Sequence, residues 1–99
     1  MIKHIVAWTF ADAPDKPARV DRVVELLTAC SGLPGVESFA LVRPQDGLEA
    51  SFDLLLESTF TDADALAAYV VHPLHKAAGA YIAEVREARW AMDFDPDAV

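Results

Sequence analysis

Three histidines and a tyrosine are the side chains in this 99-residue sequence whose types and spacing suit proton-transfer chemistry. Tyr69, His72 and His75 cluster around Pro73, and His4 lies near the N-terminus. An imidazole that is neutral near physiological pH can act as a general base. A tyrosine hydroxyl can orient a carbonyl or support an oxyanion. The candidate catalytic residues are therefore His75 as base, Tyr69 as polariser, and His4.

Each of these side chains also has a structural interpretation, which the sequence leaves open. Pro73 must break or restart its helix. His75 then lies in a first turn, where the helix dipole opposes a positive charge, or it bonds a carbonyl and holds the kink. The position of His72 just before the proline favours capping of the break over ligand binding. Tyr69 also fits a core position with a paired hydroxyl, and His4 fits either a structural pair or a pocket wall.

The sequence predicts neither a metal site nor a covalent nucleophile. His72 and His75 have metal-ligand spacing, but Pro73 interrupts the helix and no carboxylate or thiolate cluster accompanies them. Cys30 is expected in the last turn of a helix, where the thiol pKa is raised. No glycine run resembles a phosphate loop, and no serine lies in a nucleophile elbow. We therefore expect no metal and no cofactor.

Four strands and two helical regions are expected to position these residues. Apolar alternation predicts strands over residues 1–10, 36–43, 52–60 and 89–95. Helical spacing predicts one helix between Asp15 and Gly32, and a second that opens on a capping box at Thr61. Pro73 divides this second helix, which resumes over about 74–87. The order β-α-β-β-α-β predicts a single α+β domain over residues 1–99, with a ferredoxin-like four-stranded antiparallel sheet covered by helices on one face.

The relative apolarity of alternate residues predicts which sheet face the helices cover. The face with large side chains is expected beneath the helices, together with the inward helix residues: Trp8, Phe52, Leu54, Leu56, Phe60, Trp90, Met92, Phe94, Leu66, Tyr69 and Val70. A ligand pocket there is expected to be lined by Trp8, His72, Trp90 and Met92. The opposite face is expected to carry Ile5, Ala7, Thr9, Leu55 and Ala91. The acidic segment 93–97 is expected to be a solvated end.

Composition favours a second copy of the chain as partner and counts against nucleic acid and membranes. Hydrophobic residues make up 54 % of the chain, which is high for one small domain and indicates a second buried surface. We expect a homodimer in which two open sheet faces pair as a dimeric α/β barrel. A net charge of −8 counts against nucleic-acid binding, because phosphate contacts need a basic patch. One cysteine, no leader pattern and no long apolar run predict a cytoplasmic protein without membrane contact.

Five segments together resemble the Dabb family, the stress-responsive dimeric A/B barrel domain. They are residues 1–10, 33–39, 52–60 and 90–94, and the motif Tyr-x-x-His-Pro-x-His at 69–75. The resemblance implies a dimeric barrel without a defined biochemical activity. Olivetolic acid cyclase-like members close a linear polyketide by intramolecular aldol condensation. Their pocket histidine and tyrosine match His75 and Tyr69, and their first-strand histidine matches His4.

Three function classes therefore stay open. The first is a homodimer with a pocket for a small apolar or phenolic ligand between sheet and helices. The second is a cofactor-independent cyclase or lyase acting on polyketide-like compounds, and a related oxygenase branch is an alternative to cyclisation. The third is a structural module that assembles beyond the dimer and catalyses nothing.

Overall fold

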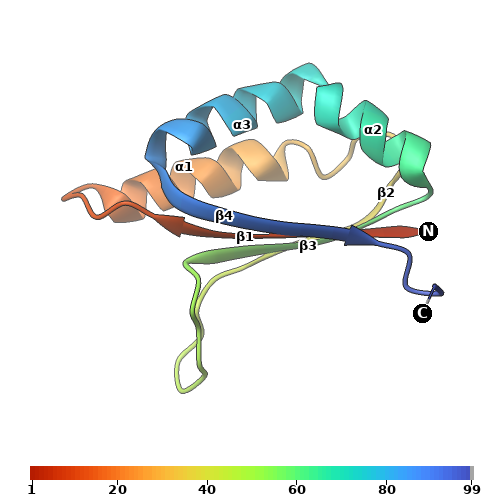
Figure 1. The fold of residues 1–99 in the computed structure, drawn as a ribbon. Helices are drawn as coiled ribbons and strands as arrows, with labels where there is room; N and C mark the ends of the chain where they lie inside the picture. The colour runs from red at the N-terminus through yellow and green to blue at the C-terminus, as the bar shows by residue number, and fades with distance from the viewer. Residues whose placement is uncertain (99) are drawn as a thin grey trace.

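A computed structural model describes residues 1–98 as one sheet with all its helices on one side (Figure 1). The elements in chain order are β1 (Ile2–Phe10), α1 (Lys16–Thr28), β2 (Val36–Val42), β3 (Leu54–Phe60), α2 (Ala63–Val71), α3 (Pro73–Val85) and β4 (Arg86–Phe94). The strands pair antiparallel in the order β2-β3-β1-β4. The predicted ferredoxin-like βαββαβ fold is confirmed.

The helices begin where the sequence supplies a start signal. Pro17 occupies the first turn of α1, and Val20, Val23 and Leu27 form its buried stripe. The α2 cap is Asp62, whose side chain accepts from the Ala65 amide at 2.8 Å. The predicted capping box at Thr61 was therefore one residue early, because Asp62 has the extended backbone that a cap needs. No helix within residues 1–98 is long and apolar enough to span a bilayer.

The core lies between the helices and the helix-facing side of the sheet. Its main cluster includes Val6, Trp8 and Phe10 of β1, Leu54 and Leu56 of β3, Val23 and Leu27 of α1, and Ile82 and Val85 of α3. A second cluster joins Cys30, Phe60, Leu66 and Tyr69 near the α2 end. Both clusters place large apolar side chains from β1 and β3 where the alternation predicted them.

The predicted phase of β4 was wrong. Trp90 and Met92 are 50 % and 67 % exposed, and Phe94 is exposed as well. Trp90 pairs with Ala7 and Met92 with Ile5, and directly paired residues project to the same side of a sheet. These side chains therefore lie on the face away from the helices.

The opposite residues of β4 change face with them. Arg89, Ala91 and Asp93 pair with Trp8, Val6 and His4, so they lie on the helix-facing side, and Ala91 does not belong to the open face. The cause is the junction with α3: β4 starts directly after Val85, a core residue, and this connection sets the phase. Apolarity alone favoured the other phase.

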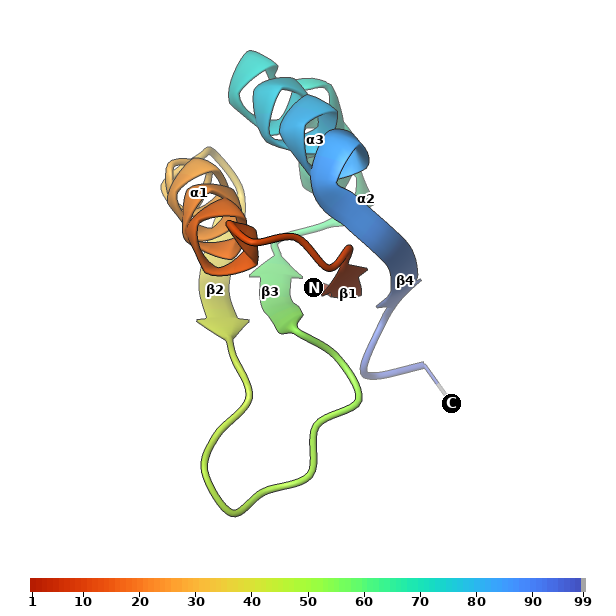
Figure 2. The same cartoon turned by 90° about the vertical axis from the view of Figure 1, so that its left-hand side faces the viewer.

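Two further expectations on buried residues were wrong. Val70 is exposed, because the inward stripe of α2 runs through Leu66 and Tyr69 only. Phe52 precedes β3 in the long β2–β3 connection and packs on Trp90, with ring centroids 5.1 Å apart. This connection, residues 43–53, extends away from the sheet on the side opposite the helices (Figures 1 and 2).

Candidate functional site

A cavity of about 280 Å³ lies between α3 and the sheet, and we call it the α3 cavity. It brings together all three predicted catalytic residues, His4, Tyr69 and His75, and it includes Trp8 from the predicted pocket. The remaining lining residues are Val6, Leu27, Leu56, Gly79, Ile82, Ala83, Arg86 and Arg89. His72, Trp90 and Met92 do not line it, because His72 lies at the helix break and the other two lie across the sheet.

The α3 helix contributes one stripe of residues to the cavity. His75, Gly79, Ile82 and Ala83 recur at three- and four-residue spacing, which places them on one helical face. Gly79 and Ala83 are the small members of this stripe, and both are exposed. The helix-facing side chains of β4 are exposed too. The cavity therefore opens between α3 and β4.

His75 is held by the backbone of the preceding helix. Its Nδ1 lies 3.0 Å from the carbonyl oxygen of Val70, and because a carbonyl only accepts, Nδ1 carries the proton. This contact is the kink-holding bond of the structural interpretation. It also leaves Nε2 as a free acceptor, as a general base requires, so both interpretations of His75 are satisfied at once.

The surroundings keep His75 neutral. Burial is the main cause that lowers the pKa of the imidazole below its usual 6.5, and the nearby charges of His4 and Arg89 lower it further. The hydrogen bond to the Val70 carbonyl acts in the opposite direction. The imidazole is therefore unprotonated at neutral pH, the state in which Nε2 can take up a proton.

Two buried donors in the lining lack a partner. The Tyr69 side chain is 2 % exposed, and neither its hydroxyl nor the indole Nε1 of Trp8 has a hydrogen-bond partner among the described residues. Leaving such a group unpaired costs about 1–3 kcal/mol. Burial, with a smaller contribution from Cys30, raises the pKa of the Tyr69 phenol, so it stays an O–H donor.

His4 is oriented by a carboxylate that sequence reasoning missed. Its Nδ1 lies 2.5 Å from Oδ1 of Asp93 on β4, and its carbonyl accepts from the Ser58 hydroxyl at 2.7 Å. The His4 ring lies edge-on to Tyr69, with centroids 6.2 Å apart, and Tyr69 lies 4.6 Å from His75. Asp93 was expected in a solvated tail. Had the phase of β4 been predicted as it is observed, Asp93 would have been expected on the same side of the sheet as His4.

His72 has the capping role that its position before Pro73 predicted. Its Nδ1 accepts from the Leu74 amide at 3.1 Å, so it closes the N-terminus of α3. Cys30 is buried, and burial raises the pKa of its thiol. Within residues 1–98, no three His, Cys, Asp or Glu side chains gather in a way that could hold a metal ion.

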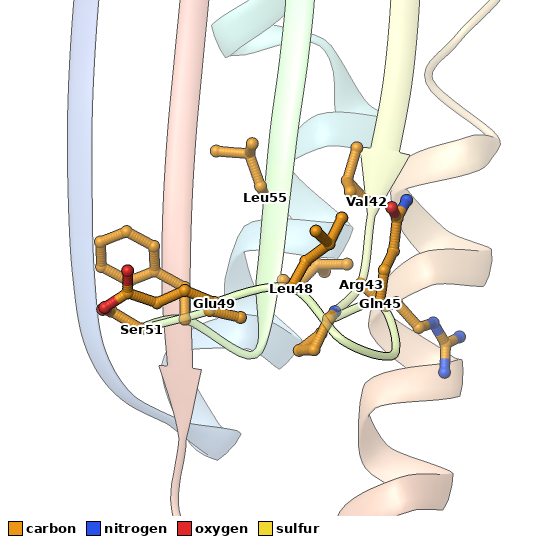
Figure 3. A pocket seen from close by; sticks show the side chains of 11 residues that line it. Val42, Arg43, Gln45, Leu48, Glu49, Ser51 and Leu55 are labelled. Atoms are coloured by element: carbon orange, nitrogen blue, oxygen red, sulfur yellow. The ribbon is translucent and has the colours of Figure 1, made fainter.

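A second, larger hollow of about 470 Å³ lies inside the β2–β3 connection, and we call it the loop hollow. Figure 3 shows Leu48 pointing from the connection toward Leu55 and Val42, while Arg43 points away. Arg43 donates to Asp21 of α1 at 2.8 Å. None of the histidines, tyrosines or unpartnered donors described above lines this hollow. It continues the apolar face of the sheet through Phe52 and Leu55.

A comparison with family models identifies one family. The family model described as "Stress responsive A/B Barrel Domain" (Dabb) matches residues 2–96. A dimeric ferredoxin-like protein of unknown function from Thermobifida fusca is 26 % identical, with a TM-score of 0.83 over 94 % of this chain and 88 % of that one. No curated protein matches the chain.

Two further solved structures are similar over nearly their whole length. A dimeric protein of unknown function with a ferredoxin-like fold from Bacteroides fragilis is 26 % identical, with a TM-score of 0.75 over 95 % of this chain and 94 % of that one. A Dabb family protein from Mesorhizobium loti is 25 % identical, with a TM-score of 0.77 over 96 % and 95 % of the two chains.

Proposed function

Since this chain belongs to the Dabb family of stress-responsive A/B barrel domains, we propose that it forms a homodimer through its open sheet face and binds a small molecule in the α3 cavity. The observation that carries the ligand proposal is the pair of unpartnered donors, Trp8 Nε1 and the Tyr69 hydroxyl, beside an open cavity. A ligand oxygen that accepts from them would remove the cost of burying them unpaired. The apolar walls at Val6 and Leu56 suit an aromatic or aliphatic body.

The homodimer is supported by the apolar side chains that the fold leaves uncovered. We call the sheet surface opposite the helices, formed by Ile5, Ala7, Leu55, Trp90, Met92 and Phe94, the open face. Its β4 members are all exposed. Contiguous exposed apolar surface is unusual on a monomer, and burial against a second sheet gains about 25 cal/mol per Å². The relatives from Thermobifida fusca and Bacteroides fragilis are described as dimeric.

Ligand binding is tested by calorimetric titration with 2-naphthol, a phenol with an apolar body. Gly79 lines the cavity, and a Cβ added there meets nothing within 4 Å. We expect one 2-naphthol per chain and a loss of binding in Gly79→Leu, whose side chain occupies the ligand's space. Ala80→Leu, on an exposed position of the same helix, is the control and keeps binding. Unchanged binding in Gly79→Leu would overturn the proposed site.

A second candidate function is cofactor-independent carbon–carbon chemistry, and the free Nε2 of His75 favours it. In this proposal Nε2 takes a proton from the carbon next to a ligand carbonyl, and the electron pair left behind forms an enolate. The Tyr69 hydroxyl donates to the enolate oxygen. The enolate carbon then attacks a second carbonyl of the same molecule, and the resulting alkoxide recovers the proton from His75. Atoms and electrons balance without a cofactor, as in an aldol cyclisation.

The first step of this chemistry can be measured without the natural substrate. We expect the protein to accelerate deuterium exchange at the carbon next to the carbonyl of 4-phenyl-2-butanone, followed by proton NMR. The rate should be constant at neutral pH and fall below the lowered pKa of His75, because only the neutral imidazole is a base. Exchange no faster than in buffer would contradict the enzymatic candidate and leave the binding proposal standing.

A further inference from the structure

Among the arginines of the described residues, the two on β4 form no ion pair. Sixteen acidic residues outnumber eight basic ones in this chain. Lys16, Arg19, Arg22 and Arg43 each lie within 4 Å of a carboxylate. Among the described residues, Arg86 and Arg89 have no such partner, and the same is true of Lys3 and Lys76. These two arginines are also the ones that line the α3 cavity.

The fold directs both arginines to the helix-facing side of β4. Arg89 pairs in register with Trp8, and Arg86 pairs with Phe10. The guanidinium of Arg89 is close enough to His75 for its charge to act on that imidazole. Arg89 therefore shares one region of the cavity with the indole of Trp8 and with His75. Arg86 extends the same charge along the α3 side.

Four of the polar groups that line the cavity can donate hydrogen bonds. Trp8 Nε1, the Tyr69 hydroxyl and the two guanidinium groups can donate, and none of them has a hydrogen-bond partner among the described residues. No carboxylate lines the cavity, and Asp93 is occupied by His4. His75 Nε2 is the acceptor that we assign to this site. A surface built this way complements a ligand group with several acceptor oxygens and a negative charge.

Most of the remaining lining residues are apolar and would contact an apolar part of the ligand. Val6, Leu27, Leu56 and Ile82 form the apolar part of the lining. The cavity therefore has a cationic mouth between α3 and β4 and an apolar interior. A compact molecule with an acidic group at one end and a ring or short chain at the other matches this division.

We propose that Arg89, assisted by Arg86, makes the α3 cavity selective for ligands that carry a carboxylate or a comparably acidic oxygen group. This inference rests on the proposed ligand-binding function and adds the substrate class. The acidic group lies at the mouth, where Arg89 donates to it. The apolar body extends inward along Val6 and Leu56.

The test compares 2-naphthoate with 2-naphthamide, two probes of nearly equal shape that differ in charge. Calorimetry on the full chain should give a Kd roughly tenfold or more lower for the carboxylate, because a hydrogen bond to a charged group outweighs a neutral one. Arg89→Gln should reduce this preference to about one by weakening 2-naphthoate alone. Arg86→Gln should reduce it partly.

The control is Arg22→Gln, which removes the same charge from an exposed position on α1 and should keep the preference. Folding of every variant is checked by thermal unfolding. Equal affinity of the two probes, or a preference that survives in Arg89→Gln, would overturn the inference while the binding function stands. Failure of both probes and of 2-naphthol to bind would overturn the binding function as well.

Discussion

The α3 cavity and the loop hollow lie on opposite sides of one sheet and differ in what they offer. The loop hollow is larger, about 470 Å³ against 280 Å³, but apolar side chains such as Leu48 and Leu55 dominate its interior (Figure 3). The α3 cavity contains His4, Tyr69, His75 and unpartnered donors. Size alone would therefore select the hollow that lacks the predicted catalytic residues. The buried polar groups without hydrogen-bond partners make the α3 cavity the better candidate for chemistry. The exposed apolar side chains make the loop hollow and the adjoining open face the better candidate for contact with a second copy.

The largest effect is expected from removal of the base in the α3 cavity. His75→Ala should lower ketone deuterium exchange by about 10²–10⁴-fold, the usual contribution of a general base. The lost bond to Val70 should cost only about 1 kcal/mol of unfolding free energy. His72→Ala is the control, because it removes a helix cap at a similar cost of about 1 kcal/mol and should keep the activity. Equal loss of activity in both variants would mean that His75 acts through stability.

The next effect concerns the apolar side of the comparison. Met92→Lys should weaken the dimer by about a hundredfold or more, because pairing would bury an unpartnered charge. Light scattering over a dilution series measures the change. Ala68→Lys, which adds the same charge on the exposed side of α2, should leave the dimer intact. Binding of 2-naphthoate should survive in the Met92→Lys monomer, and its loss would show that the α3 cavity and the open face are not independent.

A smaller effect is expected at Gly79, which lies inside a helix and lines the α3 cavity. Gly79→Ala should raise the unfolding free energy by about 0.5–1 kcal/mol, since glycine is unfavourable in helices and the new Cβ has room. Affinity for 2-naphthol should fall at the same time. Ala80→Gly should show the opposite stability change without an effect on binding. Stabilisation with unchanged affinity for 2-naphthol would show that Gly79 does not contact the bound ligand.

The smallest effect is the pH dependence of stability that His75 contributes. Its pKa is lowered in the folded state, so below pH 6.5 the unfolded chain binds more protons and folding weakens. The contribution is complete above pH 6.5 and is lost as pH falls toward the folded pKa. Thermal unfolding between pH 5 and 6.5 should therefore show a shallower slope in His75→Gln. An unchanged slope would contradict a lowered pKa for His75.

The sequence predicted the fold and part of the site for different reasons. Period-two and helical spacing, together with Pro73, were enough for the order of elements, because these signals are local. The meeting of His4, Tyr69 and His75 was anticipated from the family motif and from the expected faces of their elements. The capping role of His72 followed from its place before a proline, which restricts its backbone.

The parts that could not be predicted depend on strand phase. Trp90 and Met92 were expected beneath the helices because they are more apolar than Arg89 and Asp93, and this phase turned Arg89 and Asp93 away from the helices. That rule holds when only one face of a strand becomes buried. It fails in β4, where the apolar side chains are exposed on the open face and the inner face borders a cavity with polar lining. The direct connection of α3 to β4 after Val85 decided the phase, and single-residue patterns do not contain that information.

The central claim is that one side of the sheet receives a ligand and the other receives a second copy of the chain. The chain has two tryptophans, and each reports on one side: Trp8 in the α3 cavity and Trp90 on the open face. A single ¹⁵N NMR titration of the indole N–H signals therefore tests both halves. Addition of 2-naphthoate should shift Trp8 and leave Trp90 in place, and dilution should do the reverse. A ligand that shifts Trp90 alone, or dilution that shifts Trp8 alone, would contradict this assignment.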